Sequence, residues 1–97
     1  MSAQSSVPGE CPRLDVRFLL DAEPSPGLLP RLLQPFARRD VIPDRACWYR
    51  NENVIHVEIA CEKMPATYVH LLEGNLRQVV GVQRLTVLLP DVVQQAA

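Results

Sequence analysis

The chain has 97 residues, enough for one small domain with a modest hydrophobic core. With 47% hydrophobic residues, 22% charged residues and a formal net charge of −1, it has no general attraction to nucleic acid or to anionic membranes. The longest apolar runs are too short to cross a bilayer, and no basic region followed by an apolar stretch marks a secretory signal. We therefore expect a cytoplasmic protein.

The first part of the chain reads as a tail followed by a strand. Residues 1–12 contain Ser, Gln, Pro and Gly with little apolar content, which is typical of a disordered tail. From Leu14 to Asp21 the apolar side chains fall on every even position. This period of two indicates a β-strand with one buried face.

A helix is expected next. Ser25 suits its N-cap and Pro26 its first position, where the missing N–H costs nothing. We expect Pro35 to kink this helix or to weaken its last turn. Its predicted apolar stripe consists of Leu29, Leu32, Leu33 and Phe36.

Two strands, 45–50 and 54–61, follow as a predicted hairpin around the polar turn Asn51-Glu52-Asn53. A three-residue turn would pair Arg50 with Val54. It would therefore place Trp48 opposite His56, on the face of the sheet that the helices do not cover.

The last two elements are a helix that starts at Pro65 and a strand over residues 82–89, with Gly81 expected as the C′ residue of the helix. Residues 91–97 read as a second tail, which leaves residues 13–90 as the domain. The order is strand, helix, strand, strand, helix, strand. It predicts an α+β ferredoxin-like βαββαβ sandwich, with a four-stranded antiparallel sheet in the order 4-1-3-2 and two helices on one face.

Proteins of this fold have many functions, and the residues that most of these functions require are missing from this sequence. The outward positions of the two central strands are Arg17, Leu19, His56 and Glu58, with no aromatic to stack on RNA bases. The cysteines Cys11, Cys47 and Cys61 form no paired metal-binding motif. We predict no nucleic-acid site, no metal site and no cofactor.

Catalysis is also not expected. His56 and Glu58 lie two apart on one strand and would lean out side by side without a pocket. No nucleophile, base and orienting group come together in the sequence. We therefore predict that the chain is not an enzyme.

Two regions are candidates for binding. Trp48 falls on a predicted edge strand, where an exposed tryptophan favours a dimer or partner interface; Arg50 and His56 are placed there with it. Backbone N–H groups at Gly27 and Leu28, at the start of the first helix, are suited to a small carboxylate. With the flanking Glu23 and Ser25 they form the candidate effector-binding site.

Three segments resemble the ACT domain, and within it the small regulatory subunits of acetolactate (acetohydroxyacid) synthase. They are Pro26-Gly27-Leu28-Leu29, Phe36-Ala37-Arg38-Arg39 and the helix-to-strand passage from Leu72 to Val82. The resemblance covers residues 14–89. It implies a homodimer that regulates the catalytic subunit of a thiamine-diphosphate-dependent synthase of branched-chain amino-acid biosynthesis, with an amino-acid effector held at the dimer interface against residues 25–28.

The sequence departs from that family at two places. Pro24 stands where the family usually has Asp or Asn, and Asp40-Val41-Ile42-Pro43 replaces a Gly-aromatic-Asn-Ile pattern. Both departures remove groups that would hold an effector. An alternative is therefore a stand-alone dimerisation or interaction module of the same fold that has lost effector binding.

Overall fold

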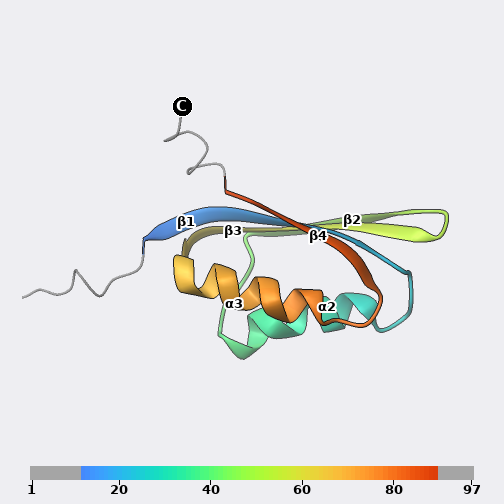
Figure 1. Ribbon diagram of the computed structural model, residues 1–97, viewed down its shortest axis with the longest axis horizontal. Helices are drawn as coiled ribbons and strands as arrows, with labels where there is room; N and C mark the ends of the chain where they lie inside the picture. The colour runs from blue at the N-terminus through green and yellow to red at the C-terminus, as the bar shows by residue number, and fades with distance from the viewer. Residues whose placement is uncertain (1–11, 90–97) are drawn as a thin grey trace, which may run out of the picture.

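The computed structural model describes residues 12–89. The two predicted tails and Cys11 lie outside the described residues, apart from Pro12. The elements are β1 (Arg13–Ala22), α2 (Leu28–Arg38), β2 (Arg45–Asn51), β3 (Val54–Pro65), α3 (Ala66–Arg77) and β4 (Val82–Leu88). The strands form one antiparallel sheet in the order β2-β3-β1-β4, and both helices lie on the same face of it (Figure 1). The predicted βαββαβ fold, including its strand order, is confirmed. No helix within residues 12–89 has the length and apolarity needed to span a membrane.

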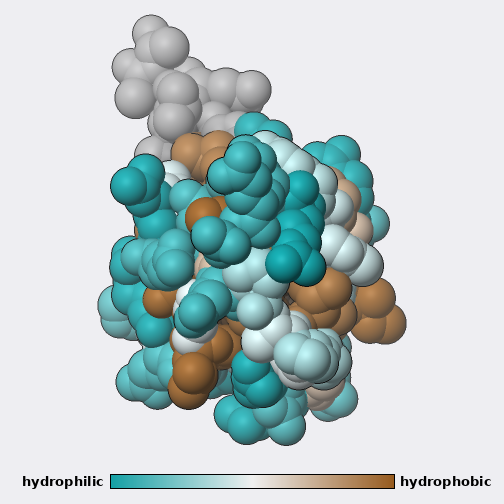
Figure 2. Space-filling model, turned by 90° about the vertical axis from the view of Figure 1, so that its right-hand side faces the viewer, coloured by the Kyte–Doolittle hydropathy of each residue, from teal (hydrophilic) through white to brown (hydrophobic). Residues whose placement is uncertain are grey.

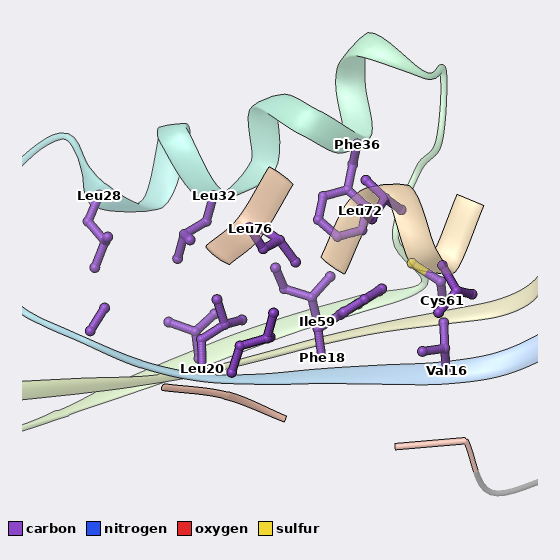
Figure 3. Close-up of a cluster of buried hydrophobic side chains, with 14 of the residues drawn as sticks. Val16, Phe18, Leu20, Leu28, Leu32, Phe36, Ile59, Cys61, Leu72 and Leu76 are labelled. Atoms are coloured by element: carbon purple, nitrogen blue, oxygen red, sulfur yellow. The ribbon is translucent and has the colours of Figure 1, made fainter. Parts of the chain in front are cut away.

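The core lies between the sheet and the two helices. Apolar side chains from alternate positions of β1 and β3 meet the inward faces of α2 and α3 (Figure 3). At the centre the rings of Phe18 and Phe36 are 5.7 Å apart in an edge-to-face arrangement, which aromatic pairs favour. The largest fully buried side chains are Phe18, Phe36, Leu20, Leu28, Leu32, Ile59, Leu72, Leu76 and Val16.

The start of α2 differs from the prediction. Gly27 is the N-cap and Leu28 the first helical residue, and no side chain caps the helix. Pro26 and Gly27 form a turn in which the Leu28 N–H donates to the Ser25 carbonyl at 3.1 Å. The helix thus begins two residues later than expected, and its buried face agrees only in part with the predicted stripe. That face comprises Leu28, Leu32, Pro35 and Phe36, while Leu33 is exposed.

Pro35 lies in the last turn of α2, where the sequence predicted a kink or a weakened turn, and it does not end the helix. The helix continues through Pro35 to Arg38, and the proline ring packs in the buried face. The apolar contact that the ring makes there offsets the loss of one backbone hydrogen bond.

The hairpin between β2 and β3 has a two-residue turn, so the predicted three-residue turn was wrong. Glu52 adopts a positive φ of 57°, which reverses the chain tightly and pairs Asn51 with Val54. The register moves by one residue, and every side chain of β2 changes face. Trp48 therefore lies opposite Val57, on the helix side, and Tyr49 lies opposite His56.

The C-terminal end of α3 also differs from the prediction. The helix ends at Arg77 with Gln78 as its C-cap, so Gly81 is not its C′ residue. Gly81 instead has a φ of 101° in the turn before β4, where its carbonyl accepts the Glu23 N–H at 2.8 Å. A glycine is needed here because an L side chain rarely adopts that φ.

Candidate functional site

The loop between β1 and α2 holds the four predicted effector residues. Glu23 and Ser25 are exposed, Gly27 is half-buried and Leu28 is buried in the core. The Leu28 N–H donates to Ser25, so one of the two backbone donors proposed for a carboxylate is already used. The structure thus brings these residues together in one loop but gives Leu28 a packing role.

Arg31, which the sequence analysis did not single out, is the charged group of this loop. Its guanidinium donates to the Ser25 hydroxyl at 3.2 Å and lies over Gly27, where a Cβ would stand 2.5 Å from Nη1. A guanidinium is the side chain best suited to a planar carboxylate. The signal was present in the sequence, because Arg31 lies four residues after Gly27, one helical turn along.

The edge strand β2 is the most exposed element of the described chain. All seven of its residues are exposed, and it contacts no element except β3. The tip of the hairpin reaches beyond the ends of both helices (Figure 1). Trp48 is 52% exposed although it points to the helix side, because β2 contacts no helix. Seen from the hairpin end, the apolar groups are scattered among hydrophilic ones (Figure 2).

The three predicted interface residues do not share a face. Trp48 and Arg50 point to the helix side of the sheet, whereas His56 points to the open side. There the His56 ring stacks on Tyr49 with 4.8 Å between ring centres, and its Nδ1 lies 2.7 Å from Asp21 Oδ1. Tyr49, 64% exposed, is the aromatic residue of the open face, a consequence of the register that the sequence analysis missed.

Glu58 does not form an acid–base pair with His56. Its carboxylate accepts hydrogen bonds from Arg45 at 2.7 Å and Arg17 at 3.4 Å. The hydrogen bond from Arg45, supported by Arg17, holds the pKa of Glu58 below its usual range. On the open face Asp21, Cys47, Tyr49, His56 and Glu58 border a shallow depression of about 360 Å³.

Because this pKa is lowered in the folded state, the Glu58 ion pair contributes stability above the ordinary glutamate pKa of about 4.3. That contribution is lost as the pH falls through the lower, folded pKa. We expect Glu58→Gln to unfold at lower urea concentration than the wild type at pH 7, and the difference to shrink below about pH 4. Glu62→Gln removes a carboxylate that has no ion pair in the described residues and is the control. A gap that stays constant across this pH range would contradict the assignment.

The two described cysteines should react very differently. Cys47 is exposed on β2, whereas Cys61 is 3% exposed in the core, and burial raises the pKa of its thiol to about 11. In a Cys11→Ser background, a thiol reagent at pH 8 is expected to label Cys47 at once and Cys61 only after unfolding. Peptide mass mapping checks this, with Cys47→Ser as the control. Early modification of Cys61 would contradict its burial.

Comparisons with known proteins agree with this fold. The profile of a family described as an ACT-like domain matches residues 10–95. The crystal structure of the ACT domain from GTP pyrophosphokinase of Chlorobium tepidum aligns with a TM-score of 0.68 at 13% identity, covering 78% of this chain and 99% of that one. The solution NMR structure of the same domain gives 0.64 at 14% identity, covering 76% and 84%. No curated protein matches the chain. At these identities the solved structures bear on the fold alone.

Proposed function

The chain belongs to the ACT-like domain family, and on this premise we propose that it is a non-catalytic regulatory domain that dimerises and acts on a partner enzyme. ACT domains are regulatory modules that commonly dimerise and bind amino-acid effectors. The observation that carries the proposal for this chain is the exposed strand β2. An edge strand with free backbone groups and two exposed aromatic residues is suited to a protein interface.

The effector in this proposal is a small amino acid at the β1–α2 loop. Its carboxylate would be held by Arg31, which lies over Gly27, with Glu23 and Ser25 as flanking polar groups. Leu28 would support the loop from the core. Because the loop is open to solvent on one side, a second copy of the chain would close the site at the dimer interface.

The partner we propose is the catalytic subunit of an acetolactate synthase-type enzyme of branched-chain amino-acid biosynthesis. This finer proposal rests on the sequence resemblance of three segments, which are Pro26-Gly27-Leu28-Leu29, Phe36-Ala37-Arg38-Arg39 and the passage from Leu72 to Val82. Affinity purification of the tagged chain from its source cell is expected to recover a large synthase subunit. Recovery of a different enzyme would retain the regulatory role and replace the partner.

Effector binding can be tested by calorimetry with valine, leucine and isoleucine. We expect at least one to bind, and Gly27→Ala to weaken that binding about tenfold, because the added Cβ displaces the Arg31 guanidinium. The φ of Gly27 is −94°, so alanine is compatible with its backbone. Gly74→Ala is the matched control, since no atom lies within 4 Å of its added Cβ.

The alternative function, an interaction module without an effector, is favoured by two contacts within the loop. The Leu28 N–H donates to the Ser25 carbonyl, and the Arg31 guanidinium occupies the space above Gly27. Calorimetry in which all three amino acids give no heat would support this alternative. The dimer and partner proposals would be unaffected by that result.

A further inference from the structure

A groove lies between α2 and the end of α3. Its volume is about 250 Å³, which suits a small molecule and not a large cofactor. Two arginines and three amide side chains line it, together with three apolar residues, and no carboxylate does. The lining residues are Arg31, Gln34, Pro35 and Arg38 from α2 and Asn75, Gln78, Val79 and Val80 from α3 and the turn after it.

The two arginines of this groove have no acidic partner among residues 12–89. Outside the groove, Arg17, Arg45 and Arg77 each form an ion pair with a glutamate. The other described arginines, which are Arg13, Arg39, Arg50 and Arg84, form none. Among the described residues, the Arg31 side chain donates one hydrogen bond, to Ser25, and α2 carries no acidic residue. The groove is thus a local concentration of positive charge on a chain whose net charge is −1.

Helix stability does not account for both arginines. Arg38 lies in the last turn of α2, where the helix dipole favours a cation, but Arg31 lies at the end of the first turn, where the dipole disfavours one. Helix stability thus accounts for Arg38 but not for Arg31, whose exposed guanidinium is paired with no carboxylate within residues 12–89.

The spacing of the two arginines determines the kind of anion. Seven residues apart, they lie on the same side of α2 with about 10 Å between their Cα atoms. Guanidinium groups on long, flexible side chains at that spacing can each bind one acidic group of a single small molecule. Asn75 also lines the groove, and its buried Oδ1 has no hydrogen-bond partner in the described chain.

We propose that this groove binds a small molecule with two anionic groups, carboxylates or phosphates, held between Arg31 and Arg38. The groove adjoins the effector loop but differs from it. Arg31 borders both the loop and the groove. Arg38 lies two turns further along the helix and borders the groove but not the loop. Arg38 is therefore the residue that distinguishes a groove ligand from a loop effector.

The test is calorimetric titration of the full chain with citrate and with pyrophosphate, against acetate and inorganic phosphate at the same ionic strength. We expect saturable binding of at least one of the two probes that carry more than one acidic group, citrate or pyrophosphate, weakened tenfold or more in both Arg31→Gln and Arg38→Gln. Arg84→Gln is the matched control, because Arg84 is an exposed arginine on β4 without an ion pair in the described residues. It should change the affinity less than twofold.

The outcomes separate the sources of the anion and the two proposals. Citrate alone would indicate a dicarboxylate ligand, and pyrophosphate alone a phosphorylated one. Three results would contradict the proposed anion site: no binding of either probe, equally tight binding of acetate or phosphate, or an Arg84→Gln variant that weakens binding as much as Arg38→Gln does. Branched-chain amino-acid binding that survives in Arg38→Gln would leave the proposed effector function intact whatever happens to the groove.

Discussion

Replacing Phe18 with alanine is expected to lower the free energy of unfolding by about 3–5 kcal/mol. Phe18 is fully buried at the centre of β1, and its ring packs edge-to-face on Phe36 of α2. The substitution removes apolar burial and this contact together, and it leaves a cavity between the sheet and the helix that the surrounding elements can fill only in part. A loss of this size is a large fraction of the total stability of a typical small domain.

Urea denaturation followed by circular dichroism measures this effect. Leu71→Ala is the control, because Leu71 is 46% exposed on α3 and should cost less than about 1 kcal/mol. If Phe18→Ala and Leu71→Ala lowered stability equally, the two faces of the molecule would have been assigned incorrectly.

The fold was predictable because its core obeys simple periodicity. The even residues of β1 are apolar and the odd ones mostly polar, so only one face could be buried, and Val16, Phe18 and Leu20 are all in the core. The same period of two placed Ile55, Val57 and Ile59 inward on β3. Two helices of that length and a right-handed crossover rule leave few other arrangements.

Two predictions that were wrong, the hairpin register and the start of α2, each depended on one local feature. The hairpin register depended on the positive φ of Glu52. Glutamate rarely adopts that conformation, and no sequence pattern predicted it. One residue of register moved Trp48 to the helix side and Tyr49 to the open side. The start of α2 likewise depended on whether Ser25 capped the helix or accepted a hydrogen bond from Arg31.

The candidate sites were therefore predictable only as regions. The β1–α2 loop was proposed from the backbone donors at the start of the predicted helix, and β2 from a tryptophan on a predicted edge strand. The side chains that face each region could be predicted only in part, because side-chain direction follows from register and helix phase. Arg31 was missed since an arginine on a helix surface is ordinary until its position over Gly27 is known.

The second large effect is expected at strand β2. If two copies of the chain associate through this edge, as proposed, Trp48→Ala should raise the dissociation constant of the dimer about 30-fold, which corresponds to ~2 kcal/mol for an interface tryptophan. Because Trp48 is 52% exposed and β2 contacts no helix, the loss of the Trp48 side chain should leave the folded monomer intact. Sedimentation equilibrium over a range of concentrations gives the constant.

Tyr49→Ala distinguishes the two faces of the edge strand. Tyr49 follows Trp48 in β2 and pairs with His56 of β3. It points to the open side, where it stacks on His56. If the partner covers the helix side of β2, Trp48→Ala weakens the dimer far more than Tyr49→Ala does. The reverse ranking would mean that the copies meet through the open face of the sheet. The interface would then contain Tyr49 and His56 in place of Trp48 and Arg50. A wild-type chain that stays monomeric at every concentration would rule out both arrangements, and β2 would then be available for the partner enzyme itself.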